Sequence, residues 1–236
     1  MANVGSSRSN FNKGLIQPAH DWCMSVLRLI PMDGRSVTTG LKGRSSLFSF
    51  DFSSATDRFP LAVQGLIIEA KFNRLTAFAW VACGLGTNVF SCQTSRDSRR
   101  LGSSRLIRFA TGQPLGFLSS WPLFALCHHF IVWYCAEKVY PNRVFKRYAL
   151  LGDDLVIGDE RVAEVYRHVM DRLGVKISLA KTLTSDCGGL EFAKKFRIHD
   201  RELSPLSLKM IRSIRFSVAL MPVLKSIGIP SGLFEA

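Results

Sequence analysis

Two adjacent aspartates, Asp153 and Asp154, are the residues of this sequence best suited to chemistry. They lie in the stretch YALLGDDLVIGD, where branched and apolar residues predict strands over 147–151 and 155–157. Gly152-Asp153 between the strands suits a type II′ turn, which takes glycine at its first central position. Two carboxylates at such a tip repel each other unless a cation lies between them, and oxygen ligands suit Mg²⁺ or Mn²⁺. The alternative is a solvated turn without a ligand.

Asp51 and Asp57 are the next candidates. The alternation in LFSFDF predicts a strand over 47–52, with its phenylalanines facing the core and Asp51 facing the other side. Small polar residues and then Pro60 indicate that the chain turns into a helix and brings Asp57 back toward Asp51. Two carboxylates of this segment would then serve one site, whereas the alternative for Asp57 is a helix N-cap.

The stretch TGQPLGFLSSW leads into a predicted apolar helix that contains two histidines. Ser119 and Ser120 fall at its N-terminus, where hydroxyls and free amides suit a sugar hydroxyl or a phosphate. His128 and His129 are candidate ligands, but histidines in an apolar helical row are more often hydrogen-bonded core residues. We therefore assign neither histidine a catalytic role.

Further elements follow from periodicity and from turn residues. Helices are predicted after Pro18 as far as residue 29, over 64–82 with Leu66 on one face, and over 161–173. Strands are predicted over 175–179 and over 190–196, and the second of these carries Lys194 and Lys195.

The charge balance points to a polyanionic partner. The chain of 236 residues has 31 Lys and Arg against 18 Asp and Glu, a formal charge of +13, which favours nucleic acid or an acidic membrane surface. The densest basic stretch is 95–108, and its guanidinium groups match phosphate geometry. Its alternative is a solvated loop. Its arginines are Arg96, Arg99, Arg100, Arg105 and Arg108.

Several other classes of protein are disfavoured. None of the six cysteines forms a Cys-x-x-Cys pair, so neither a zinc knuckle nor a thiol redox motif is indicated. No apolar stretch near the start could act as a secretory signal. The most apolar window, 114–136, contains serines, a proline and both histidines, which indicates a buried helix rather than a membrane span.

Taken in order, these stretches resemble motifs A to E of the RNA-dependent RNA polymerases of mitoviruses. The resemblance covers residues 15–208, because QPAHDW near the start and LSPLSL near the end also look like family segments. Plant mitochondrial and nuclear genomes carry sequences of the same kind. The matching stretches are DFSSATDR at 51–58, GQPLGFLSSW at 112–121 with the two histidines downstream, LLGDDLVIGD at 150–159, ISLAKT at 177–182 and EFAKKF at 191–196.

The resemblance implies an α+β fold, the palm of a right-hand polymerase, with an antiparallel sheet flanked by helices and partial fingers. The palm and partial fingers would span 15–208. Residues 1–14 would be disordered, and 209–236 would be a helical segment at the start of the thumb or a truncated tail.

It also implies RNA-directed RNA synthesis by nucleotidyl transfer, with Mg²⁺ or Mn²⁺ as cofactor. Two ions about 4 Å apart would activate the attacking 3′-hydroxyl and stabilise the leaving pyrophosphate. Asp51 and Asp153 would be the principal metal ligands, with Asp154 beside them, and Lys181 would protonate the pyrophosphate.

The substrate contacts carry over in the same way. The ribose 2′-hydroxyl, which distinguishes RNA precursors from DNA precursors, would be recognised by Asp57, Ser119 and Ser120. Arg58 and Gly112 would complete the nucleotide site. The residues expected to bind RNA template and primer are Lys194, Lys195, Arg99, Arg100 and Arg105.

The chain also departs from the family. It begins after the place of motif F, a basic segment that covers the incoming triphosphate, so we expect an N-terminally truncated polymerase, active alone or assisted by a second chain that supplies this segment. Localisation in the mitochondrion follows from the resemblance. One alternative is an inactive remnant that only binds RNA. A reverse transcriptase or maturase is disfavoured, because the turn reads Leu-Gly-Asp-Asp and because Asp57 stands where a DNA-making enzyme would need a bulky side chain.

Overall fold

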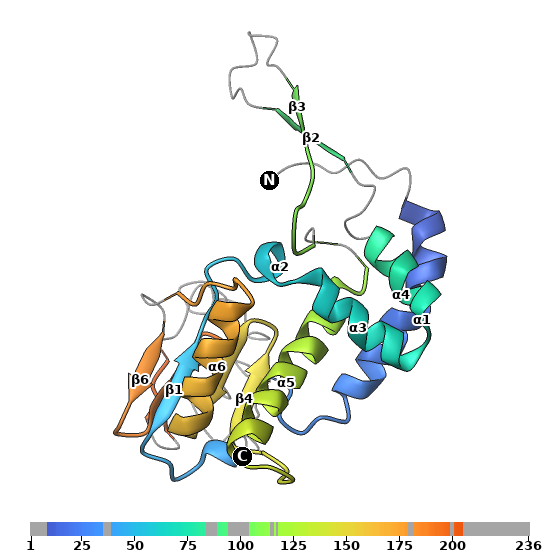
Figure 1. Ribbon diagram of the computed structural model, residues 1–236. Helices are drawn as coiled ribbons and strands as arrows, with labels where there is room; N and C mark the ends of the chain where they lie inside the picture. Colours follow the sequence, from blue (N-terminus) through green and yellow to red (C-terminus); the bar gives the residue numbers. More distant parts are fainter. Residues whose placement is uncertain are drawn as a thin grey trace, which may run out of the picture.

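A four-stranded antiparallel sheet lies at the centre of the fold (Figure 1). The computed structural model describes residues 9–34, 39–83, 89–93, 104–113, 116, 118–178, 182–198 and 201–204. The strand order is β4-β5-β1-β6, and each strand is antiparallel to its neighbours. The strands are β1 (Leu47–Phe50), β4 (Tyr148–Leu151), β5 (Asp154–Ile157) and β6 (Leu183–Ser185).

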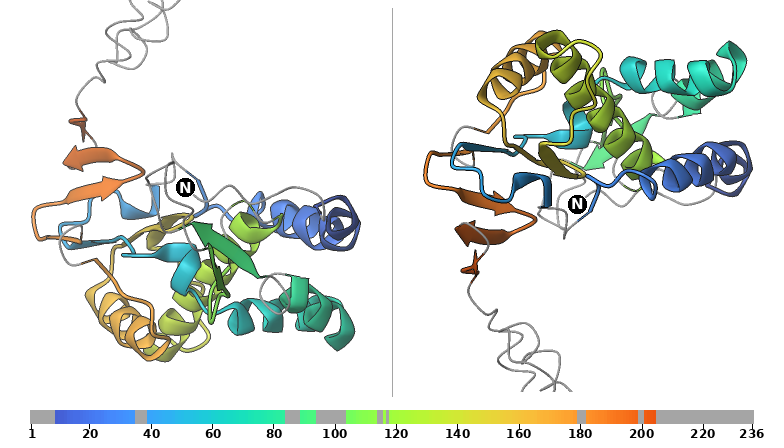
Figure 2. Two further views of the ribbon diagram at one scale, coloured as in Figure 1. Left: turned by 90° about the horizontal axis from the view of Figure 1, so that it is seen from above. Right: turned by 90° about the horizontal axis from the view of Figure 1, so that it is seen from below.

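Helices cover one face of this sheet (Figure 2). Phe48 and Phe50 of β1 and Leu155 of β5 pack there against α5 (Ser120–Val139) and α6 (Glu160–Arg172). The predicted alternation of β1 is thus confirmed, and so are the hairpin and the helix over 161–173 within a residue at each end.

A second, smaller sheet covers the opposite face, as Figure 2 shows. Leu47 and Val156 of the central sheet are buried with Leu190 and Phe192 of the small sheet. Because both faces are covered, Ser49, which points away from the phenylalanines, is also buried. The small sheet contains β7 (Gly189–Phe192), β8 (Lys195–Ile198) and β9 (Arg201–Glu202).

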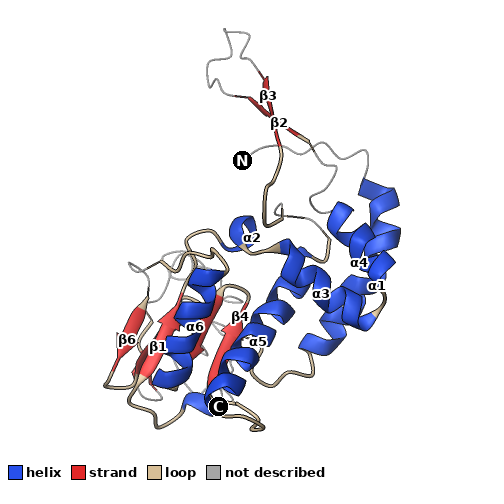
Figure 3. Ribbon diagram, in the orientation of Figure 1, coloured by secondary structure: helices blue, strands red, loops and turns tan. Residues whose placement is uncertain are grey.

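The helix predicted over 64–82 is two helices, α3 (Leu61–Lys71) and α4 (Arg74–Val81). The break occurs because the Asn73 side chain accepts a hydrogen bond from Thr76 N at 2.8 Å and so caps a new helix. The face that we predicted was wrong, since Leu66 is 63% exposed. Together with α1, these two helices lie beside the central sheet rather than on it (Figure 3).

Helix α1 (Ser9–Leu27) also differs from the prediction. It begins before residue 15, so residues 9–14 are helical rather than disordered, and Pro18 lies inside it. A proline inside a helix costs a hydrogen bond. Ile16 and Ala19, buried on both sides of Pro18, join the main core and support the helix across this gap.

Two predicted strands were wrong as well. Of the described residues 175–178, only Ile177 pairs, in an isolated bridge to Phe52, and the stretch 190–196 is broken into β7 and β8. The break is a two-residue turn at Ala193 and Lys194, with φ of +53° and +63°. Neither residue is of a type that favours this region, so the sequence carries no local turn signal there.

The basic stretch lies partly outside the described residues. Strands β2 (Phe90–Gln93) and β3 (Ser104–Ile107) form a ribbon that projects from the rest of the molecule (Figure 1). Arg105 belongs to β3, whereas Arg99, Arg100, Lys181 and the segment 209–236 lie outside the described residues. None of the helices in the described part is long and apolar enough to cross a membrane.

The orientation of α3 can be tested with two truncations. Ile68 is fully buried, so Ile68→Ala should lower the free energy of unfolding by about 3 kcal/mol through lost contacts and a cavity. Leu66→Ala removes a largely exposed side chain and should change it by less than about 0.5 kcal/mol. Urea denaturation of both variants measures the difference, and equal losses would contradict this orientation.

Candidate functional site

The tip of the β4–β5 hairpin carries the two adjacent aspartates. Leu151 pairs with Asp154, which leaves Gly152 and Asp153 as the turn residues. Gly152 has φ of +62°, and Asp153 lies outside the positive-φ region, as a type II′ turn requires. A side chain at Gly152 would also approach the indole nitrogen of Trp121, since a Cβ there would lie 3.1 Å from it. Two constraints therefore require glycine at this position.

Asp51 lies at the same end of the sheet as this tip. Phe50 pairs with Leu155, and continuing this register by one residue sets Asp51 opposite Asp154. The end of β1 is held from its other side, because Ser178 N donates to the Asp51 carbonyl at 2.8 Å. Carboxylates from two adjacent strands thus lie at one end of the central sheet.

The protonation of Asp154 reflects its carboxylate neighbours. Burial, together with the negative charges of Asp153, Asp51 and Glu191, raises the pKa of Asp154 to about 6. Lys194, on the β7–β8 turn, acts in the opposite direction. Sequence reasoning had given Glu191 no role, although it lies in the quoted stretch EFAKKF, because only the packing of the small sheet brings it here.

The donor set fits a hard divalent cation. Among the described residues, no group of three or more His, Cys, Asp or Glu side chains is arranged so that it could hold a metal ion. Mg²⁺, however, commonly takes one or two carboxylates and completes its shell with water and substrate phosphates. Exposed Asp153 and half-buried Asp51 and Asp154 offer such oxygens, and a bound cation would relieve their repulsion.

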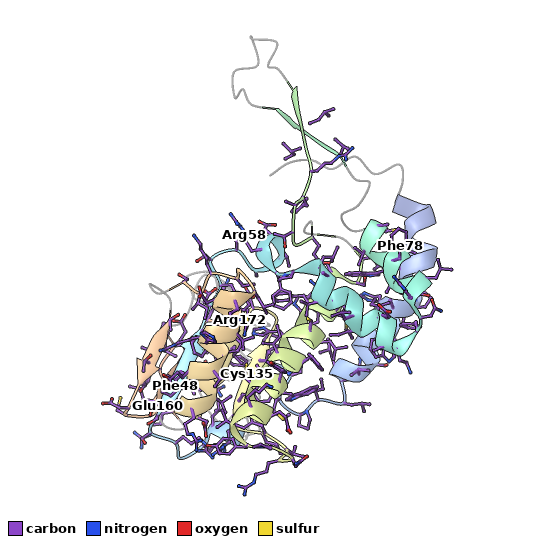
Figure 4. The ribbon with its side chains drawn as sticks, in the orientation of Figure 1. Phe48, Arg58, Phe78, Cys135, Glu160 and Arg172 are labelled. Carbon is purple, nitrogen blue, oxygen red and sulfur yellow. The ribbon has the colours of Figure 1, made fainter. Side chains whose placement is uncertain are left out.

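Asp57 lies on the one-turn helix α2 (Ala55–Arg58), close to the glycine that begins the GQPLG stretch. The cap of α2 is Ser54, so the alternative of Asp57 as an N-cap was wrong. Gly112 has φ of +69°, and a Cβ there would collide with the carbonyls of Thr56 and Asp57. Asp57 and Arg58 are both exposed. Arg58 lies on α2, at the opposite end of the central sheet from Glu160 (Figure 4).

A buried glutamine, Gln113, links α2 to the start of α5. Gln113 N donates to Thr56 O at 2.9 Å, and its side-chain Nε2 donates to Ser120 O at 3.0 Å. The same Nε2 lies 3.3 Å from Oε1 of Gln64 on α3. Gln113 thus connects three elements that are distant in sequence, a role that its sequence context did not reveal.

Both candidate serines are buried. Ser119 has φ of +68°, and its hydroxyl accepts a hydrogen bond from Nε1 of Trp80 on α4 at 2.7 Å. Ser119 is 1% exposed and Ser120 is 4% exposed, whereas Asp57 is exposed. Of the predicted ribose contacts, only Asp57 faces solvent directly.

The histidine pair is hydrogen-bonded inside the core, as the sequence analysis favoured. His128 contacts Gly152 O at 2.8 Å and Tyr166 OH at 2.7 Å. His129 contacts Tyr148 OH at 2.9 Å and Asp33 Oδ1 at 3.2 Å. Burial lowers the pKa of His128 to about 3, so this imidazole is neutral at ordinary pH.

The two lysines of the small sheet have different surroundings. Lys195 forms an exposed ion pair with Glu202 at 3.0 Å, while Lys194 influences Asp154. Lys194 is therefore the one of the pair that acts on the carboxylate cluster.

Comparison with known proteins decides the family. The mitovirus RNA-dependent RNA polymerase family matches residues 12–225. The chain belongs to this family. An uncharacterized mitochondrial protein of Arabidopsis thaliana is 44% identical over 205 residues, which cover 83% of this chain and 80% of that protein. The RNA-directed RNA polymerase of Cryphonectria parasitica mitovirus 1 is 32% identical over 150 residues, which cover 64% of this chain and 17% of the viral protein.

Solved structures confirm the palm fold. The RNA-dependent RNA polymerase of a human picobirnavirus, in an insertion-loop deletion mutant, superimposes with a TM-score of 0.61 at 14% identity over 92% of this chain and 48% of that one. Apo telomerase of Candida tropicalis, without its C-terminal domain, gives 0.58 at 10% identity over 87% and 49%. This member of the mitovirus family thus spans about half the length of these solved polymerases.

The raised pKa of Asp154 predicts a pH-dependent stability difference. An acid whose pKa rises from 3.8 to about 6 on folding binds its proton more tightly in the folded state, so its contribution to stability falls as pH rises through this window. Asp154→Asn should therefore stabilise the protein at pH 7 by about 1 kcal/mol, after allowance for solvent screening, and have little effect at pH 4. Thermal unfolding across this pH range measures the difference.

Asp186→Asn is the matched control, because Asp186 is exposed and follows Ser185, which pairs with Leu47 at the end of β1 opposite to Asp51. A stability gain at pH 7 as large in this control as in Asp154→Asn would show that net charge, rather than the cluster, causes the effect.

Proposed function

We propose that this chain carries the nucleotidyl-transfer site of an RNA-directed RNA polymerase of the mitoviral type. The observation that supports this most is the meeting of Asp51, Asp153 and Asp154 at one end of the palm sheet, in a chain of this family. A simple solvated turn gives no reason for carboxylates of two adjacent strands to lie together, or for buried residues to hold these strands in place.

Asp51 and Asp153 are proposed as the principal ligands of Mg²⁺ or Mn²⁺, with Asp154 beside them. When bound, the ions supply activation of the attacking 3′-hydroxyl and neutralisation of the leaving pyrophosphate. The protein's own residues contribute position: the strand pairing holds Asp51 beside the hairpin, and the glycine turn presents Asp153 to solvent. Lys181 stays a candidate acid for the pyrophosphate.

The nucleotide would enter from the side of α2. Asp57 can accept a hydrogen bond from a ribose 2′-hydroxyl, and Arg58 beside it can pair with a phosphate. Gly112 keeps this turn against the start of the GQPLG stretch. Ser119 and Ser120 would take part once the start of α5 is uncovered, since both are buried.

The proposed partners are ribonucleoside triphosphates and an RNA template with its primer. The charge of +13 supplies long-range attraction to RNA, and Lys194 is proposed to act next to the primer, with Lys195, Arg99, Arg100 and Arg105 as further RNA contacts. The mitochondrial location expected from the family agrees with the names of the plant relatives.

A second candidate is a non-catalytic RNA-binding protein. It is favoured by the high positive charge, +13 at neutral pH, which attracts RNA without any need for catalysis. Salt-sensitive RNA binding without synthesis is its expected behaviour.

A primer-extension assay separates the two candidates. On a primed RNA template with ribonucleotides and Mg²⁺ or Mn²⁺, we expect the chain to extend the primer, and Asp153→Ala to reduce the rate by at least about 10³-fold, because charge stabilisation at the reacting phosphate is lost. Asp186→Asn should leave the rate unchanged. If neither the wild type nor any variant extends the primer while all bind RNA, this chain does not act alone, and it is either the second candidate or part of a polymerase that a second chain completes.

Sugar selection is tested by Asp57→Asn. The amide can still occupy the same space, but the charge-assisted hydrogen bond to the 2′-hydroxyl is weakened. The preference for ATP over dATP, measured as a ratio of kcat/KM values, should fall about 10-fold, mainly through slower use of ATP. An equal loss for both nucleotides would assign Asp57 a general structural role instead.

A further inference from the structure

His128 connects the catalytic turn to two helices. It lies on α5 and is completely buried, with one ring nitrogen on the Gly152 carbonyl and the other on the Tyr166 hydroxyl of α6. The distances, 2.8 and 2.7 Å, are those of well-formed hydrogen bonds. The family assignment makes no use of this contact.

The chemistry of the partners fixes the protons. A carbonyl oxygen can only accept, so Nδ1 of His128 must carry the hydrogen that it donates to Gly152. In the neutral imidazole Nε2 is then an acceptor, and it receives the hydrogen of the Tyr166 hydroxyl. The chain of hydrogen bonds therefore runs in one direction, from Tyr166 through His128 to Gly152.

This bond acts on the one peptide that determines the turn type. Type I′ and type II′ turns differ by a flip of the peptide between their two central residues, which here is the peptide between Gly152 and Asp153. In a type I′ turn both residues have positive φ, and Asp153 would rotate to a new direction. In this structure only Gly152 has positive φ, and its carbonyl points to His128.

Packing alone does not explain a histidine here. The rings of Phe52, Phe124 and Tyr166 lie 5.1, 5.9 and 5.8 Å from that of His128, an environment that would accept a phenylalanine or a leucine. An apolar side chain would fill the space, but it would leave both the Gly152 carbonyl and the Tyr166 hydroxyl without this partner.

We propose that His128 is a positioning residue for the catalytic turn: with Tyr166 it holds the Gly152–Asp153 peptide in the type II′ orientation and so keeps the Asp153 carboxylate beside Asp51 and Asp154. The consequence for metal binding rests on the proposed polymerase function. The orientation of the peptide does not, because it follows from the hydrogen bonds alone.

Nuclear magnetic resonance of the wild-type protein tests the hydrogen bond first. With ¹⁵N-labelled histidine, His128 should show the Nδ1–H tautomer, and Tyr166→Phe should shift its Nε2 resonance. The Nε2–H tautomer would overturn the proposal. This measurement needs neither metal nor RNA, so it stands even if the protein is not a polymerase.

Two variants of His128 test positioning against simple packing. His128→Asn retains a donor near the place of Nδ1, whereas His128→Leu keeps comparable bulk without a donor. We expect the Gly152 ¹³C carbonyl shift to move in His128→Leu and to stay close to wild type in His128→Asn. Affinity for Mn²⁺, followed by electron paramagnetic resonance, should fall about 10-fold in the leucine variant and less than about 3-fold in the asparagine variant.

The outcomes are distinct. Equal shifts and equal Mn²⁺ affinities in the two variants would overturn the positioning role. If the leucine variant does not fold, the tautomer and the response to Tyr166→Phe decide. If the wild type itself does not bind Mn²⁺, the proposed metal site fails, while the carbonyl shift still tests the turn.

Discussion

Mutual repulsion of carboxylates is the constraint on which this structure depends. Burial and the nearby charges of Asp153, Asp51 and Glu191 together raise the pKa of Asp154 to about 6, so without support the hairpin tip would move away from Asp51. Buried neutral elements hold it instead: the palm strands pair on both sides of β1, and α5 and α6 close one face while β7 and β8 close the other. Lys194 offsets part of the charge from the turn of the small sheet.

The parts of the site that could be predicted are those determined by local pattern. Alternation located β1, and a glycine between two apolar runs located the hairpin, so Asp51, Asp153 and Asp154 could be assigned from sequence. The tips of antiparallel neighbours meet at one end of a sheet whatever the rest of the fold does. These residues are also the ones that carry the family resemblance.

What could not be predicted depends on contacts between distant segments. The turn at Ala193 and Lys194 has no residue type that favours positive φ, and it follows from the pairing of β7 with β8. The Asn73 cap, by contrast, is local, and the helix predicted over 64–82 overlooked it. The position of Glu191 beside Asp154 arises because the small sheet folds over the palm. Gln113 likewise looks like an ordinary loop residue until the structure shows its bonds to Thr56 and Ser120.

Ribose recognition shows how far burial revises an assignment made from sequence. A 2′-hydroxyl both donates and accepts, so it is recognised best by an acceptor and a donor together. Asp57 is an exposed acceptor on α2, while Ser119 is buried and already accepts from Trp80, which leaves its own hydrogen as the group that it can offer. The two are linked through Gln113, which bonds to both Thr56 and Ser120. A movement at the start of α5 would therefore change the contacts of α2. In the proposed site, selection of the sugar would therefore rest on Asp57 rather than on the buried Ser119.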